Sequence, residues 1–341
     1  MLEAGEARGP SIGDPGMKAC DSLKRFVARC LYCATLAVIL CIAMKFACQR
    51  LGCRTLQLVA LVGLFAFCGT AFAQRPHTLT GDIRPVNNFH SKILNNDRDV
   101  LVYLPPGYEV TKKRYSVLYL HDGQNLFDGA TSFIPGQEWR VDETAQRLIV
   151  FGKIEPLIIV GINNAGKQRI NEYTPAEDAK YKMGGKADLY GRMLVEELKP
   201  FIDAHYRTKK GAQYTGLGGS SLGGLVSIYL ALKYPTVFGR AAVVSPSVWF
   251  ANKQIVHYVE SLPKKTKVRI WMDIGTREGG TTEEAQRTVN DARLLRETLI
   301  KKGWKLGKDL SYVEAEGAQH NEAAWAARVE AILTFLFPRE L

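Results

Sequence analysis

Two adjacent serines in a glycine-rich stretch are the residues whose surroundings most clearly suggest chemistry. The stretch Gly219-Ser220-Ser221-Leu222-Gly223 has the spacing G-x-S-x-G. Between a strand and a helix, this pentapeptide forms a sharp turn that projects its central hydroxyl, and glycine neighbours avoid clashes there. The pattern selects Ser221, because Ser220 occupies its variable position and position 222 is leucine. A flexible turn without chemistry is the alternative interpretation.

A nucleophilic serine needs a histidine base, which an acid must orient. In hydrolases with this turn the chain order is serine, acid, histidine. Only His257 and His320 follow Ser221. His257 lies in a predicted helix, whereas His320 lies in a predicted loop between the last strand and the last helix. A loop at a strand end is the right place for a base, so we expect His320 in this role, with a surface histidine as the alternative.

The orienting acid should follow the penultimate strand, which ends in the segment VRIWMDIGTREGG. Asp273 and Glu278 are the two carboxylates in this segment. We favour Glu278, because Asp273 is expected to lie within the strand while Glu278 follows a turn out of it. Asp291, inside a predicted helix, ranks third.

Two backbone N–H groups are expected to form an oxyanion hole. The residue after the nucleophile, Leu222, would donate from the start of a helix. The second donor should come from the loop after an early strand, where Gly123 allows close approach and Gln124 is the candidate. The preceding pair, His121 and Asp122, resembles a catalytic pair but comes before the serine, so we expect it to structure this loop.

The elements that must position these residues alternate along the chain. Strands are predicted at Val100–Leu104, Ser116–Leu120, Leu157–Ile162, Tyr214–Leu217, Ala241–Val244, Val268–Asp273 and Ser311–Val313. Helices are predicted at Asp188–His205, Leu222–Lys233, Thr282–Lys302 and Glu322–Phe337. Such alternation is typical of an α/β fold with a mostly parallel sheet covered by helices on both faces. Sites in these folds form at the carboxyl ends of the strands, which is where the polar motifs fall.

Composition narrows the classes of partner and cofactor. The 341-residue chain carries a formal net charge of +11, but no dense Lys/Arg tract with interleaved aromatic residues follows residue 73, so nucleic-acid binding is not expected. All seven cysteines precede residue 69. The rest of the chain therefore has no disulfide, thiolate metal site or cysteine nucleophile. Without an H-E-x-x-H motif or a phosphate-binding loop, we expect no metal and no cofactor.

The first 73 residues are predicted to be a leader. The apolar run Leu56–Ala73 follows Arg50 and Arg54 and ends in Ala71-Phe72-Ala73, an A-x-A cleavage site. These features are typical of a secretory signal peptide. Translation from Met44 would give this peptide normal proportions. We therefore expect residues 74–341 to form one periplasmic or secreted domain without stable membrane insertion, with a membrane-anchored form as the alternative.

Four segments together resemble the putative esterase family of α/β hydrolases, which contains enterochelin esterase-like enzymes and feruloyl and acetyl-xylan esterases. They are Tyr119–Phe127, Gly219–Gly224, Gly275–Glu278 and His320–Glu322. The resemblance spans residues 85–338 and implies a sheet of about eight strands. It also implies a nucleophile at Ser221, a base at His320, an acid at Glu278, and oxyanion donors at Gln124 and Leu222. The acid departs from the commoner Asp.

The same resemblance suggests residues for substrate binding. The segment RINEYTP is similar to one that lines the family's cleft. Arg169 could there meet a substrate carboxylate or phenolate, and Tyr173 could stack on a ring, whereas a surface pair between Arg169 and Glu172 is the alternative. Trp249 could add an aromatic wall or belong to the core.

These inferences converge on an exported serine esterase that acts through an acyl-enzyme. The expected substrates are small-molecule or polysaccharide-linked esters, either aromatic or sugar-linked acyl esters of the feruloyl and acetyl-xylan type or siderophore esters. An acyltransferase on the same fold and a catalytically silent binding module are the alternatives.

Overall fold

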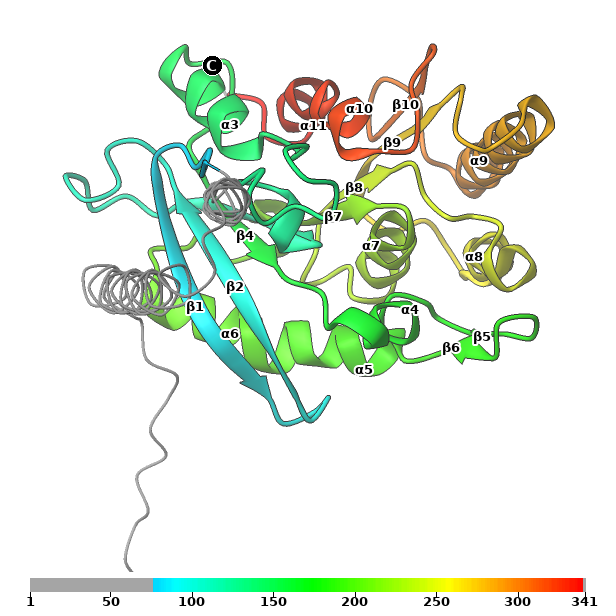
Figure 1. The fold of residues 1–341 in the computed structure, drawn as a ribbon, viewed down its shortest axis with the longest axis horizontal. Coiled ribbons are helices and arrows are strands. Elements are labelled where there is room, and N and C mark those ends of the chain that lie inside the picture. The colour runs from blue at the N-terminus through cyan, green and yellow to red at the C-terminus, as the bar shows by residue number, and fades with distance from the viewer. Residues whose placement is uncertain (1–75, 340–341) are drawn as a thin grey trace, which may run out of the picture. The chain divides into compact units, whose positions relative to one another are not determined.

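An eight-stranded sheet forms the centre of the protein in a computed structural model that describes residues 76–339 (Figure 1). The strand order is β1-β2-β4-β3-β7-β8-β9-β10. The first two strands pair antiparallel with their neighbours, and all later pairs are parallel. The strands are β1 Asp82–Ser91, β2 Asn96–Leu104, β3 Ser116–His121, β4 Leu157–Ile162, β7 Thr215–Ser220, β8 Arg240–Val244, β9 Arg269–Gly275 and β10 Leu310–Ala315.

Helices cover both faces of this sheet, which confirms the predicted α/β architecture (Figure 1). One face packs against α5 Ala187–Arg192, a π-helical turn η3 Met193–Leu198, α6 Lys199–His205, α7 Leu222–Lys233, α8 Phe250–Ser261 and α9 Thr282–Lys302. The other packs against α3 Val141–Val150, α10 Glu322–Ala326 and α11 Val329–Leu336. The remaining short elements are η1 Gly123–Asn125, η2 Gly166–Gln168, α4 Arg169–Glu172, β5 Glu177–Asp178, β6 Met183–Gly184 and η4 Ala212–Tyr214.

The core explains why the central strands are continuous apolar runs. All six residues of β3 and of β4 are buried, because helices exclude water from both faces of a parallel sheet. The helix α7 packs directly against β7 and β8 and is buried along almost its whole length. It therefore carries no polar stripe, and its amino end is held firmly at the carboxyl edge of β7.

The predicted elements are found with two differences in the helices. The predicted helix at 188–205 begins at Ala187 and contains the π-helical turn η3. The predicted helix at 322–337 is broken into α10 and α11 at Ala327 and Arg328. Strand β1 and helix α3 were not predicted.

The predictions for residues 1–73, including the signal peptide and a start at Met44, lie outside the described residues. Among residues 76–339, no helix is both long and apolar enough to cross a membrane.

Candidate active site

Parallel strands bring the predicted site residues to one edge of the sheet. The residue Ser221 follows β7, the segment 245–249 follows β8, Glu278 lies three residues beyond β9, and His320 lies between β10 and α10. Because these strands run parallel, their carboxyl ends share an edge. The residues meet there although up to 99 positions separate them in the sequence.

A strained turn presents the hydroxyl of Ser221. Its backbone has φ 59° and ψ −122°, a conformation unfavourable for a residue with a Cβ. The turn is held because the Ser221 N–H donates to the carbonyl of Val244 at 3.0 Å and the Ser221 carbonyl accepts from Leu225 N at 3.0 Å. Small residues are required beside it, since a Cβ at Gly224 would lie 2.8 Å from the Val244 oxygen.

The imidazole of His320 pairs with Glu278. Their Nδ1 and Oε2 atoms are 2.8 Å apart. The carboxylate is 2% exposed, whereas the imidazole side chain is 39% exposed. Glu278 is therefore buried behind a histidine that reaches the surface, which is the arrangement needed to orient a base toward a substrate.

The alternative acid, Asp273, is paired with Arg328 and Trp271. It is fully buried on β9 and accepts hydrogen bonds from Arg328 Nη1 at 2.7 Å and Trp271 Nε1 at 2.6 Å. Its carboxylate has no hydrogen bond to His320 among the described residues. The geometry therefore supports Glu278 over Asp273 as the partner of His320. The third-ranked Asp291 lies on α9 and forms an ion pair with Lys253 at 3.3 Å.

A half-open cavity of about 290 Å³ joins Ser221 to His320. Its other walls are Ser245, Pro246, Ser247, Val248, Trp249, Ile274, Glu278, Gly279, Thr288 and Asp291. The indole of Trp249 is 43% exposed and packs edge-on against Tyr181, with ring centroids 6.1 Å apart. The cavity therefore combines an aromatic wall with polar groups on α9.

One residue of this cavity that was not predicted is Ser247. Its hydroxyl lies 3.2 Å from the Ser221 hydroxyl, and its backbone N–H donates to the Ser221 carbonyl at 3.1 Å. The sequence contained only a weak signal for this contact, a second serine in the segment after β8.

The backbone N–H groups expected to bind an oxyanion lie at two element starts. Leu222 is the first residue of α7, and the first N–H groups of a helix have no partner within it. Gln124 is the middle residue of η1. The close approach of η1 to β4 requires Gly123, because a Cβ there would lie 2.6 Å from the backbone of Gly161.

Arg169 and Tyr173 do not line the cavity that joins Ser221 to His320. Arg169 donates two hydrogen bonds to Asp122, from Nε at 2.7 Å and from Nη2 at 2.8 Å. The surface pair with Glu172 is wrong, since Glu172 is buried and pairs with Arg98 at 3.0 Å. The predicted ring stacking by Tyr173 is also corrected, because that side chain is fully buried.

These contacts give the loop after β3 its shape. Asp122 has a left-handed backbone, with φ 57° and ψ 48°, at the start of η1. Its neighbour His121 is buried, and burial lowers the pKa of this imidazole to about 3. His121 is therefore neutral and contacts the hydroxyl of Tyr190 at 2.9 Å. This agrees with the expected structural role of the pair.

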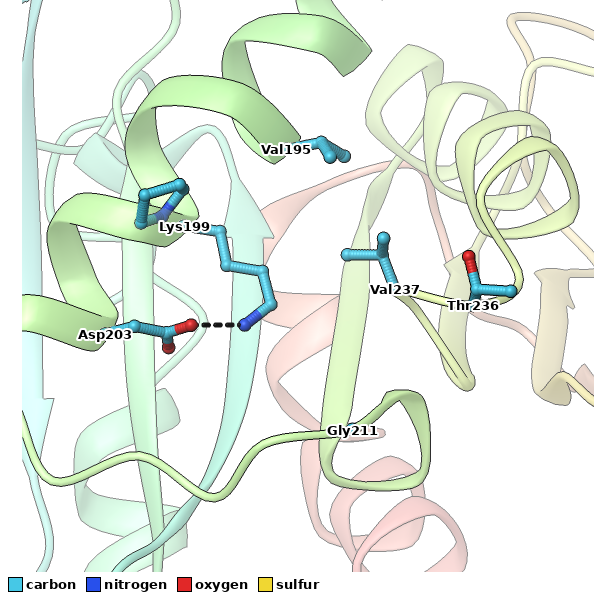
Figure 2. A pocket seen from close by; sticks show the side chains of 7 residues that line it. Val195, Lys199, Asp203, Gly211, Thr236 and Val237 are labelled. Atoms are coloured by element: carbon cyan, nitrogen blue, oxygen red, sulfur yellow. Dashed lines mark hydrogen bonds and ion pairs between the residues drawn. The ribbon is translucent and has the colours of Figure 1, made fainter.

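A second hollow of about 260 Å³ lies near the amino ends of β7 and β8 (Figure 2). Its charged groups are already paired, since Lys199 Nζ donates to Asp203 Oδ2 at 2.7 Å and Asp203 Oδ1 accepts from Thr208 at 2.7 Å.

No group of three or more His, Cys, Asp or Glu side chains within residues 76–339 could hold a metal ion.

The fold and this edge of the sheet define a protein of the α/β-hydrolase class. A sequence model described as putative esterase matches residues 91–336, and the chain belongs to this family.

Proteins with similar sequences include a named esterase. Uncharacterized protein YbbA of Bacillus subtilis is 27% identical over 249 residues, which are 71% of this chain and 93% of YbbA. An endo-1,4-beta-xylanase/feruloyl esterase of Xylanibacter ruminicola is 30% identical over 192 residues, which are 53% of this chain and 24% of that protein. Together with the family, the named relatives support an esterase, that is, a carboxylic-ester hydrolase.

Solved structures show the same fold. The enterobactin esterase FES from Shigella flexneri superimposes with a TM-score of 0.59 at 18% identity, covering 77% of this chain and 60% of FES. The BES protein from Bacillus cereus superimposes with a TM-score of 0.59 at 19% identity, covering 79% of this chain and 99% of that chain.

Proposed function

We propose that this protein is an exported serine esterase that forms an acyl-enzyme on Ser221. The observation that carries the proposal is the cavity that joins a strained, projecting Ser221 to a His320 paired with a buried Glu278. These three residue types supply a nucleophile, a base and an orienting acid. Export rests on the signal-peptide features of the leader and gives a periplasmic or secreted location.

The proposed reaction has two halves. His320 takes the Ser221 proton while Oγ attacks the acyl carbon, and Glu278 stabilises the imidazolium that forms. The N–H groups of Gln124 and Leu222 hold the oxyanion, at about 3 kcal/mol per donor. The tetrahedral intermediate collapses as His320 gives its proton to the leaving alcohol. Water then attacks the acyl-enzyme by the same route and releases the acid.

The walls of the cavity support a substrate with a ring near the ester. Trp249 offers an exposed aromatic face, and Thr288 and Asp291 place polar groups on α9 nearby. Aromatic or sugar-linked acyl esters fit this mixture, as do siderophore esters. Arg169 is not part of this proposal, because its guanidinium pairs with Asp122 and it does not line the cavity.

Hydrolysis of an ester panel tests the function. We expect the purified protein to hydrolyse p-nitrophenyl acetate and methyl ferulate without an added cofactor. Trp249→Ala should raise KM for methyl ferulate about fivefold, since an aromatic stacking contact contributes about 1 kcal/mol. The KM for p-nitrophenyl acetate should change much less, because acetate is too small to require the aromatic wall.

A matched control is Phe151→Ala, which removes an exposed aromatic ring outside the cavity at the end of α3. Both KM values should stay unchanged in this variant. Equal effects of Trp249→Ala on the two esters would contradict the ring-binding wall. Absence of turnover with these esters, an acetylated xylan and a trilactone siderophore would contradict the esterase proposal.

A further inference from the structure

Two carboxylates and one guanidinium lie together behind His320. Glu278 and Asp273 are 2% and 0% exposed, and Arg328 is 6% exposed. Arg328 Nη1 donates to Asp273 Oδ1 at 2.7 Å, while its Nη2 lies 3.8 Å from Glu278 Oε1. Buried charges are costly unless they are paired. This arrangement pairs the guanidinium mainly with Asp273.

The hydroxyl of Ser245 joins the two halves of this cluster. Ser245 Oγ accepts hydrogen bonds from Trp325 Nε1 at 3.1 Å and from Arg328 Nη2 at 3.2 Å. Because a serine hydroxyl has a single proton, that proton is left for its contact with Glu278 Oε1. Glu278 Oε1 also accepts from Gly275 N at 2.7 Å. The acceptor that faces His320, Oε2, remains for the imidazole.

The charges of the cluster explain why a second buried carboxylate is present. With Asp273, Glu278 and Arg328 all ionised, one negative charge is left over. Without the charge of Asp273, the guanidinium would neutralise Glu278 instead. We propose that Asp273 is a positioning residue that neutralises Arg328, so that Arg328 and Ser245 brace Glu278 while the charge of Glu278 serves His320. This inference rests on the proposed function of the His320–Glu278 pair.

Other charged groups also face this region and contribute to its electrostatic potential. Glu322 on α10 interacts with His320, Asp122 and Arg169, and burial raises the pKa of Glu322. Asp291 on α9 lines the cavity and pairs with Lys253. Within the cluster, burial raises the pKa of Asp273 to about 6, although Arg328 opposes this shift. Asp273 is therefore ionised above about pH 6, where its neutralising effect on Arg328 is present.

The substitution Asp273→Asn tests the inference. The amide keeps an oxygen for Arg328 but removes the charge. The titration midpoint of His320, followed by NMR of its imidazole protons and assigned with His320→Gln, should fall by about one pH unit. The acid limb of the pH profile of kcat/KM should move by the same amount. A purely structural role of Asp273 would lower activity without moving this midpoint in a defined direction.

The double variant Asp273→Asn with Arg328→Gln is the matched control. It removes both charges, so the midpoint should return to the wild-type value. Arg328→Lys keeps the charge and should leave the midpoint unchanged even if kcat falls. Should Asp273→Asn fail to fold, Asp273→Ser removes the same charge with a smaller side chain. The double variant still shows whether removing both charges restores the wild-type midpoint of His320.

An unchanged midpoint in the Asp273 variant, or a double variant that stays shifted, would overturn the inference. The NMR titration requires no turnover, so its outcome is separate from that of the proposed function. A wild-type protein that hydrolyses no ester contradicts the esterase proposal. The titrations of His320 would still decide whether Asp273 keeps the negative charge of Glu278 from being neutralised by Arg328.

Discussion

Ser221→Ala is expected to lower kcat for p-nitrophenyl acetate by about 10⁴-fold or more. The variant removes the oxygen that would form the acyl-enzyme, while the cavity, the His320–Glu278 pair and the oxyanion donors remain. Alanine fits the site without a clash, but the left-handed φ of position 221 stays strained. The fold should therefore be retained, and steady-state kinetics with a thermal unfolding control measure the effect.

The neighbouring hydroxyl provides the control for this variant. Ser220 is the last residue of β7 and is buried, and it does not line the cavity. Ser220→Ala should keep kcat within a few-fold of the wild-type value. Loss of activity in Ser220→Ala alone, with turnover retained in Ser221→Ala, would reverse the assignment of the nucleophile.

Glu278→Gln should lower kcat by about 10³- to 10⁴-fold while leaving KM nearly unchanged. The neutral amide no longer stabilises the imidazolium that forms when His320 takes the serine proton. Its NH₂ group can also face Nδ1, which favours the wrong tautomer of the imidazole. Steady-state kinetics over a range of pH separate this loss from a change in substrate binding.

A nearby exposed carboxylate serves as the comparison. Glu316 lies in the same β10–α10 loop as His320 but is exposed to solvent, so Glu316→Gln should retain activity. Full activity in Glu278→Gln would show that His320 works without this acid, and the proposed role of Glu278 would then be wrong.

Local sequence patterns predicted the elements that position the site. The helices Leu222–Lys233 and Thr282–Lys302 and the strand Leu157–Ile162 have the predicted bounds. For the two helices, the periodicity of apolar residues and a glycine after Lys302 were sufficient to predict these bounds. The packing of these helices agrees with the conformation that their local sequence prefers. The order serine, acid, histidine limited the candidates to residues after Ser221. The predicted strand end and loop then favoured Glu278 and His320, which the fold places 2.8 Å apart.

Contacts between distant segments could not be predicted in this way. The stretch 322–337 has an uninterrupted apolar pattern, but the helix is interrupted at Arg328. The side chain of Arg328 points into the buried cluster around Asp273. Arg169 was assigned to a substrate or to Glu172 because nothing local indicates Asp122, 47 residues earlier. Ser247 was missed for the same reason, since its contact with Ser221 depends on the packing of β8 beside β7.

Covalent labelling with a fluorophosphonate, followed by intact-mass measurement and peptide mapping, tests directly whether Ser221 is the nucleophile. If Ser221 is the nucleophile, the label forms one adduct per chain, located on Ser221, with parallel loss of ester hydrolysis and no adduct in Ser221→Ala. An adduct on another residue, or full hydrolysis by a protein that takes up no label, would contradict this assignment.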